Sequence, residues 1–220
     1  MSDFVELTTF GARQQNLFNM QIELLLLFFV IAVVYSSAGF GGGSSYLAVL
    51  ALFAVPMETL RPAALLCNLV VVSGNLIIFW KNGQLKIRQS APLMLAGIPL
   101  AFLGGFWKLS ERNFFLLLGF GLLAAAIAMW AQSRLSKPLS DSPASLPDSA
   151  NIGIGGALGF LAGLTGIGGG IFLSPLLNLL RWDKPKIIAA TASLFIFCQS
   201  AAGLTGQLAR QPTLVWTSIL

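Results

Sequence analysis

Apolar runs alternate with short polar breaks along most of this 220-residue chain. The runs cover residues 24–38, 46–55, 62–80, 91–107, 113–131, 171–180 and 187–208. A helix needs about 20 apolar residues to cross the hydrocarbon of a bilayer, and four of these runs approach that length. The pattern predicts an all-α polytopic membrane protein in which the runs at 24–38, 46–55 and 171–180 form shorter helices.

A glycine cluster at the end of the first run returns later in the chain. Residues 38–45 read A-G-F-G-G-G-S-S, and residues 165–170 read T-G-I-G-G-G, an offset of 127 residues. At the same offset, residues 62–66 lie opposite residues 189–193. We interpret the chain as two copies of one unit. The predicted parts are a polar N-terminal segment 1–21, a first transmembrane repeat 22–132, a hydrophilic linker 133–150 and a second transmembrane repeat 151–220.

The second repeat is expected to be C-terminally incomplete. At the offset of 127, the last two spans of the first repeat predict partners near 218–234 and 240–258, whereas the sequence ends at Leu220. Near the start of the second repeat, Gly155, Gly159 and Gly163 place small residues on one helix face. This spacing predicts close packing against another helix.

Composition agrees with a membrane protein. Hydrophobic residues make up 56% of the chain and charged residues 10%, whereas a soluble domain carries about 25% charged residues. The net charge of +5 comes from Lys and Arg scattered between the apolar runs, which is typical of the loops of a membrane protein. We therefore expect a lipid bilayer around the chain and no nucleic-acid partner.

Histidine is absent from the sequence. This removes Ser-His and Cys-His catalysis and the common zinc sites. The G-G-G-S-S motif at 41–45 suggests an intramembrane serine protease, but no lysine lies inside a span to act as its base. The two cysteines, Cys67 and Cys198, lie in apolar runs without metal-site spacing. We expect no enzyme activity, no cofactor and no metal.

The glycine clusters are the first candidate site. Each joins two runs too short to cross the membrane, so we expect broken or re-entrant helices that meet at the glycines inside the membrane. Free backbone N–H groups at the start of a helix bind anions without a cationic side chain. An alternative is that the glycines only permit tight helix packing. The candidate residues are Gly39, Gly41, Gly42, Gly43, Ser44, Ser45, Gly166, Gly168, Gly169 and Gly170.

Polar residues in the following span of each repeat add to this site. The first has Asn68, Ser73 and Asn75, and the second has Thr191, Ser193, Gln199 and Ser200. Polar side chains at membrane depth either bond to another helix or face a cavity. Asn68, Thr191 and Ser193 are the strongest candidates for substrate contact. Glu58, Arg61 and Asp183 are expected to be ordinary interfacial charges at helix ends.

The distribution of Lys and Arg bears on topology. If each glycine pair is re-entrant, eight of these residues share one side of the membrane and five the other, whereas single crossings give seven and six. The first arrangement fits the excess of positive charge in cytoplasmic loops. It places the N-terminus outside, the linker in the cytoplasm and the two repeats in inverted orientation, as in many secondary transporters.

The clusters G-F-G-G-G-S and G-I-G-G-G-I, with A-A-T-A-S-L at 189–194 and Gly203 to Gly206, resemble the sulfite exporter TauE/SafE family of membrane transporters. The likeness extends from about residue 24 to 220. It implies transport of small anions, often sulfite or organosulfonates, by a two-half bundle in the bacterial inner membrane. Residues 64–68 read A-L-L-C-N where the family often has a Thr-x-Ser-like element.

Our hypothesis is therefore a secondary membrane transporter for small anions, with the glycine clusters and the polar positions converging on a central site. The alternative is a non-transporting membrane interaction subunit or an inactive transporter fragment, in which the glycines serve packing alone. Assembly into a homo-oligomer is compatible with both hypotheses. The sequence does not identify the anion, the direction of transport or the coupling ion.

Overall fold

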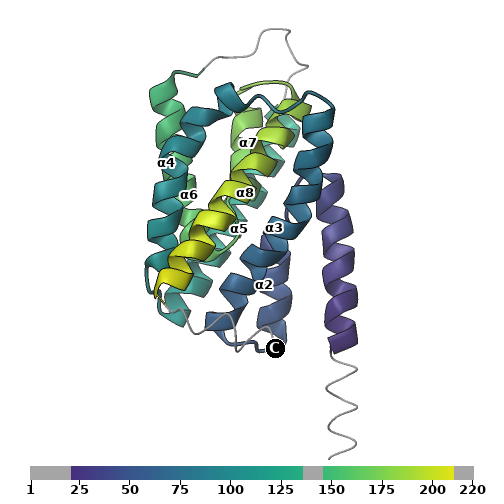
Figure 1. Cartoon of the computed structure of the whole chain (residues 1–220), viewed down its shortest axis with the longest axis vertical. Coiled ribbons are helices and arrows are strands. Elements are labelled where there is room, and N and C mark those ends of the chain that lie inside the picture. The colour runs from purple at the N-terminus through teal and green to yellow at the C-terminus, as the bar shows by residue number, and fades with distance from the viewer. Residues whose placement is uncertain (1–20, 136–145, 211–220) are drawn as a thin grey trace, which may run out of the picture.

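The computed structural model describes residues 21–135 and 146–210. The chain begins with a helix over Gln21–Ser37, and the later helices are α2 (Gly43–Leu52), α3 (Met57–Lys81), α4 (Ile87–Phe106), α5 (Glu111–Leu135), α6 (Asp148–Thr165), α7 (Gly170–Leu179) and α8 (Pro185–Arg210). Figure 1 shows them as one upright bundle. These residues form no strand, so the all-helical prediction is confirmed. Residues 1–20 of the predicted N-terminal segment, residues 136–145 of the linker and residues 211–220 of the second repeat lie outside the described residues.

Four helices, α3, α4, α5 and α8, are long and apolar enough to cross a membrane. They cover the four long runs of the sequence. By contrast, α2 and α7 have ten residues each, a rise of about 15 Å, half the thickness of the hydrocarbon layer. The predicted division into full-length and short helices is therefore confirmed.

The repeat in sequence corresponds to a repeat of helices. Helix α7 begins and ends 127 residues after α2, and α8 follows α3 at the same offset to within two residues. Each short helix is preceded by a glycine in the left-handed conformation, Gly42 at φ 81° and Gly169 at φ 76°. Only glycine adopts this conformation at little cost, so the glycines fix where both short helices begin.

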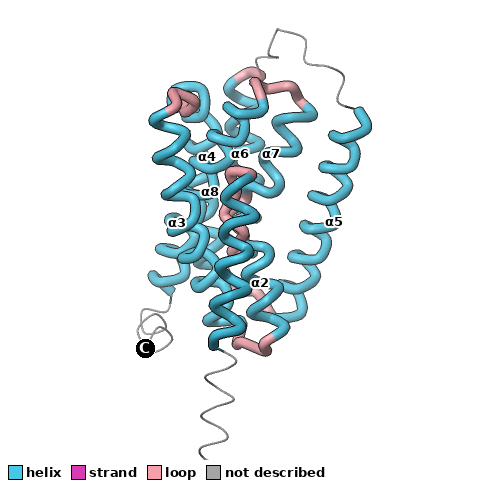
Figure 2. Tube along the Cα trace, turned by 90° about the vertical axis from the view of Figure 1, so that its right-hand side faces the viewer, coloured by secondary structure: helices cyan, strands magenta, loops and turns pink. Residues whose placement is uncertain are grey.

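Each short helix folds back along the helix before it. The rings of Phe28 and Tyr46 lie 4.8 Å apart, which brings α2 against the helix over Gln21–Ser37. At the other hairpin, Trp182 Nε1 donates to Asn151 Oδ1 over 3.2 Å and joins the end of α7 to the start of α6. In Figures 1 and 2, α2 lies in the lower half of the bundle and α7 in the upper half. The two glycine turns consequently lie inside the bundle.

Small residues let α6 pack directly on α4. A Cβ atom added at Gly155, Gly159 or Gly163 would collide with the backbone carbonyls of Leu93, Gly97 and Ala101 respectively. The constant spacing of these pairs means that the two helices run parallel in close contact. The predicted packing face of small residues is confirmed.

Two charged residues that were expected at helix ends are buried. Helix α3 begins at Met57, so Arg61 lies within its first turns and is only 5% exposed. Asp183 is also 5% exposed, because its carboxylate is paired with Lys86 Nζ at 2.8 Å. Sequence spacing placed both residues next to polar breaks, but tertiary packing covers them.

Helix also occupies both ends of the predicted linker. Helix α5 reaches Leu135 and α6 begins at Asp148. Pro147 precedes α6 in an extended conformation, and Asp148 lies in its first turn, where a carboxylate interacts favourably with the helix dipole.

Candidate functional site

The first glycine turn, residues 38–42, is held by side chains from two long helices. Ser193 Oγ of α8 donates to the carbonyl of Gly39 over 2.5 Å, and Asn75 Nδ2 of α3 donates to the carbonyl of Phe40 over 3.4 Å. Ser36 Oγ in turn donates to Asn75 Oδ1 over 2.7 Å. A turn within a membrane protein cannot satisfy its carbonyls within a helix, so these side chains do so instead.

Asn68 of α3 joins the two glycine clusters. It is fully buried, and its Nδ2 donates to the carbonyl of Ile167 over 2.9 Å. A Cβ atom on Gly43 would lie 2.5 Å from Asn68 Nδ2 and 2.6 Å from the Ile167 carbonyl, and one on Gly41 would collide with Asn68 Oδ1. Only glycine at these positions lets the first cluster approach Asn68 and the second cluster so closely.

The second cluster contacts the same asparagine and a serine of α8. Gly168 has φ 85°, and a Cβ atom there would lie 2.9 Å from both Asn68 Nδ2 and Ser200 Oγ. Within the described residues, Ser200 Oγ and Asn68 Oδ1 are buried without a hydrogen-bond partner. Most buried polar atoms in proteins are paired. One unpaired atom, the acceptor Asn68 Oδ1, lies beside Gly41 and Gly43 of the first cluster, and the other, the hydroxyl of Ser200, lies beside Gly168 of the second.

Backbone donors gather at the same place. The N–H groups of residues 41–44 and 167–171 donate to no acceptor within the described residues. The first N–H groups of a helix lack intrahelical partners and carry the positive end of the helix dipole. Because α2 and α7 both begin here, two helix N-termini meet around Asn68.

Among the described residues, no charged group lies against the glycine clusters. Arg61 touches Gly166, but through its backbone and Cβ: its carbonyl oxygen lies 3.4 Å from a Cβ atom placed on Gly166. Its guanidinium points elsewhere, with Nη2 donating to the carbonyl of Gly163 over 3.0 Å. The polar groups at the centre are therefore backbone groups and uncharged side chains.

Three of the predicted polar residues lie apart from this centre. Thr191 Oγ1 forms a hydrogen bond with Ser90 Oγ of α4 at 3.0 Å. This is a bond to another helix, the alternative to facing a cavity that the sequence analysis left open for such residues. Ser45 Oγ donates to Tyr35 Oη over 2.7 Å within the first hairpin. Ser44 is buried in the first turn of α2.

Several of the predicted glycines serve packing around the turns. Added Cβ atoms would meet Ile31 at Gly42, Phe195 at Gly169, Ile196 at Gly170 and Phe79 at Gly39. The centre is therefore formed by Gly41, Gly43, Asn68, Ile167, Gly168 and Ser200, and Ser193 supports it through Gly39.

Sequence reasoning did not rank Ser200 and Gln199 among the strongest candidates, yet both are fully buried and polar. Ser200 lies at the centre, and the amide nitrogen and oxygen of Gln199 have no hydrogen-bond partner within the described residues. The Gln199 amide faces α4, where a Cβ atom on Gly97 would come within 2.5 Å of its Nε2. The sequence signals for Ser200 are its polarity in an apolar span and the repeat offset of 127 residues, which pairs it with Ser73.

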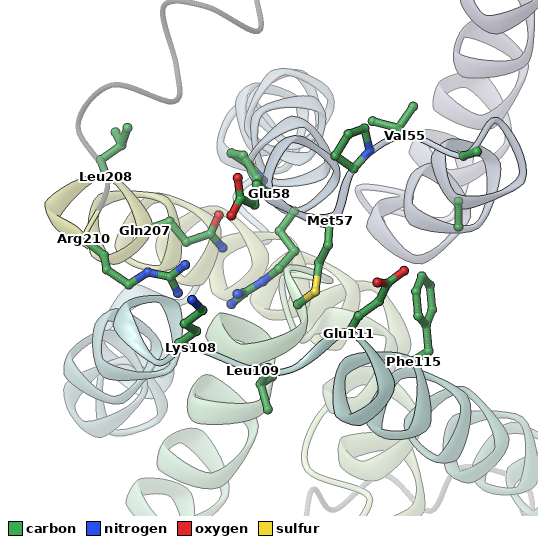
Figure 3. A pocket seen from close by; sticks show the side chains of 15 residues that line it. Val55, Met57, Glu58, Lys108, Leu109, Glu111, Phe115, Gln207, Leu208 and Arg210 are labelled. Carbon is green, nitrogen blue, oxygen red and sulfur yellow. The ribbon is translucent and has the colours of Figure 1, made fainter.

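A cavity of about 600 Å³ opens near the N-terminal end of α3 (Figure 3). We call it the basic cavity, and its polar lining consists of Glu58, Arg61, Lys108, Glu111, Gln207 and Arg210. No local sequence pattern indicates this cavity, because the residues that line it come from three distant segments. Beyond the other end of α3, the Lys86–Asp183 ion pair joins two loops. Burial raises the pKa of Asp183, but hydrogen bonds from Lys86 and from the Lys184 N–H hold the pKa below its ordinary value.

Comparison with known proteins identifies the family. The sequence profile of the sulfite exporter TauE/SafE family matches residues 24–220. The chain belongs to this family. It is 36% identical over 190 residues to "Probable membrane transporter protein y4hK" of Sinorhizobium fredii, covering 86% of this chain and 76% of the relative. It is 27% identical over 195 residues to "Probable membrane transporter protein MJ0441" of Methanocaldococcus jannaschii, covering 84% and 71%.

A shorter match agrees with these. Over 55 residues the chain is 44% identical to "Probable membrane transporter protein YunE" of Bacillus subtilis, covering 25% of this chain and 20% of the relative. No solved structure matches the chain significantly. Family membership and the four membrane-length helices make this a multi-pass membrane protein of a transporter family.

Proposed function

We propose that this protein is a secondary transporter for small anions, with sulfite and organosulfonate-like sulfur compounds as the substrate class. The TauE/SafE family is named for sulfite export, and the relatives are named only as membrane transporters. The substrate class therefore rests on the family description and on the chemistry of the central site.

The observation that carries the proposal is the meeting of two helix N-termini around Asn68. Unbonded N–H groups of both clusters, and the unpaired hydroxyl of Ser200, supply donors that suit an anion. Without a fixed cation, such a site selects for negative charge and size. It also holds the anion weakly enough to release it, which transport requires.

The two repeats are proposed to be inverted, with a re-entrant hairpin at the start of each. Support comes from the equivalent helices α2 and α7, which lie in opposite halves of the bundle (Figures 1 and 2). In this topology α2 and α7 begin at mid-membrane and end at opposite faces. Rocking of one repeat against the other would then expose the centre to each side in turn.

Charge supports one orientation. Lys81, Lys86 and Arg134 lie at the helix ends near the ion-paired loops, together with the basic loop at 181–186. By the excess of positive charge in cytoplasmic loops, that end faces the cytoplasm. The basic cavity then opens on the outer side.

The test compares a central hydroxyl with its repeat partner. Ser200→Ala removes the unpaired central hydroxyl, whereas Ser73→Ala at the equivalent position removes a hydroxyl that only donates to Leu69 of its own helix. We expect Ser200→Ala and Asn68→Ala to lower the kcat/KM of sulfite uptake into proteoliposomes about tenfold, the effect of about 1.4 kcal/mol. Ser73→Ala should transport like the wild type. Equal rates for Ser200→Ala, Asn68→Ala and Ser73→Ala would refute the assignment of the site.

A further inference from the structure

The basic cavity holds an excess of positive charge. Arg61, Lys108 and Arg210 line it, against the two carboxylates of Glu58 and Glu111. In Figure 3 the amino end of Lys108 and the guanidinium of Arg210 point toward one another, whereas Glu111 lies beside Phe115. Among residues 21–135 and 146–210, none of these three cations forms an ion pair. With three cations against two carboxylates, the described lining carries a net positive charge.

Arg61 on the wall of this cavity is the most buried of the three cations. It is 5% exposed, and its Nε has no hydrogen-bond partner within the described residues. A buried arginine is normally paired with an anionic group, because its guanidinium carries five donors and a fixed charge. Here its side chain makes one hydrogen bond, from Nη2 to the carbonyl of Gly163, and its Cζ lies 6.0 Å from the centroid of the Phe114 ring. Gln207 Nε2, also on the cavity wall, is buried and unpaired as well.

Arg61 also connects the cavity to the second glycine cluster. Its guanidinium binds Gly163 near the end of α6, and its backbone lies against Gly166, where the cluster begins. An anion held by Arg61 would therefore lie next to the turn that leads to the centre. Another cavity, of about 700 Å³ between α4 and α8, is lined almost entirely by apolar side chains and offers no such group.

We infer that the basic cavity is a second oxyanion-binding site, a vestibule in which Arg61, Lys108 and Arg210 capture the substrate before or after it occupies the glycine centre. This inference rests on the proposed function for the identity of the anion. The ligand class is a small oxyanion with two or more acceptor oxygens, sulfite or an organosulfonate. Met57, Leu109 and Phe115 line the rest of the cavity and suit the carbon part of the organic substrate.

Electrostatics explains why charge belongs at the mouth and not at the centre. A cleft lined by one sign of charge raises the local concentration of the opposite ion and its rate of entry. A cation fixed at the buried centre would bind an anion far more tightly, because attraction grows as the effective dielectric constant falls. A cationic mouth followed by a neutral centre therefore favours entry without trapping.

The same oxyanion chemistry is present in phospholipid head groups, so the experiment separates the two sources. Lys108→Gln and Arg210→Gln each remove one cavity charge, and both residues are at least partly exposed, so folding should survive. Arg112→Gln is the matched control. Arg112 lies four residues after Lys108, is exposed and does not line the cavity. Uptake of sulfite and of methanesulfonate is measured in proteoliposomes of purely zwitterionic lipid, and again with an anionic lipid added.

For each cavity variant we expect KM to rise on the order of tenfold with kcat within about twofold, because a uniform attraction to the anion is lost. Arg112→Gln should keep the wild-type KM. An unchanged KM in both cavity variants, or an equal rise in Arg112→Gln, would overturn the vestibule. A difference that appears only with anionic lipid would likewise overturn it, in favour of a head-group site.

Direct binding separates this inference from the proposed function. Calorimetric titration of sulfite into the purified protein in detergent should show weaker binding to the Lys108→Gln, Arg210→Gln double variant than to Arg112→Gln. Such a difference in a protein that transports no anion would support the vestibule and contradict the proposed function. Transport by the wild type, with equal KM and equal binding in all variants, would contradict the vestibule alone.

Discussion

Adding one methyl group at Gly43 should separate the two glycine clusters. Its Cβ would lie 2.6 Å from the carbonyl of Ile167 and 2.5 Å from Asn68 Nδ2. The first cluster would have to retreat by about 0.8 Å to reach the short end of ordinary van der Waals contact. Overpacking of this kind costs about 1–3 kcal/mol. A retreat of that size also displaces the N–H donors from any anion bound between the clusters.

We expect Gly43→Ala to lower the kcat/KM of anion uptake by about 5-fold to 140-fold, since each 1.4 kcal/mol corresponds to a factor of ten. The assay is sulfite uptake into proteoliposomes at matched protein density. Gly74→Ala on α3 is the control, because nothing lies within 4 Å of its added Cβ atom. That substitution should leave uptake unchanged and stabilise the helix by up to about 1 kcal/mol.

Thermal melting in detergent distinguishes a damaged site from a damaged fold. Gly43→Ala should still elute as a folded protein and melt cooperatively, with a melting temperature lowered by about 2–4 °C for each kcal/mol of overpacking. If Gly43→Ala transports as fast as Gly74→Ala, contact between the clusters is irrelevant to transport and our reasoning is refuted.

Two further predictions concern stability. Gly159→Ala should lower the melting temperature, because its Cβ would meet the α4 backbone and overpacking costs about 1–3 kcal/mol. The control is Gly153→Ala in the same helix, where an added Cβ has open space. An equal effect of the two substitutions would contradict the close α4–α6 contact. Asp183→Asn should cost up to about 1 kcal/mol, since the Lys86 side chain is 47% exposed. Because the pKa of Asp183 is lowered in the fold, its contribution is present above the ordinary carboxyl pKa of about 3.9 and is lost as pH falls through the lower folded value. The difference in melting temperature between wild type and Asp183→Asn should therefore be present at neutral pH and vanish in acid; a difference that persists in acid would contradict this.

The helices could be predicted from the sequence because apolar length and glycine position are local signals. The offset between Gly42 and Gly169 gave the start of both short helices, since each position needs a backbone that only glycine adopts easily. Gly155, Gly159 and Gly163 gave a packing face in the same way, because helical spacing alone places them together.

The central site could be predicted only in part. Asn68 stood out as an amide in an apolar run, and the structure places it between the clusters. Thr191 looked equivalent in the sequence, but it bonds to Ser90 of α4, a partner 101 residues away that no local pattern reveals. Whether a polar residue faces the centre depends on helix rotation, which the sequence does not specify.

Charged residues were the least predictable. Arg61 follows a polar break and precedes Pro62, which is typical of a helix end. Helix α3 nevertheless starts four residues earlier, and α6 covers the guanidinium. The basic cavity joins Arg61 with Lys108 and Arg210 only through the tertiary fold.

The most direct test of the central claim is uptake by the unmodified protein in proteoliposomes. Labelled sulfite, methanesulfonate and the uncharged dimethyl sulfone would be compared at equal concentration, with and without a pH gradient. We predict saturable uptake of the two anions and none of the uncharged sulfone. Absence of saturable uptake of either anion, by protein shown to be folded and inserted, would contradict the account and favour an interaction role in which the glycines serve packing alone.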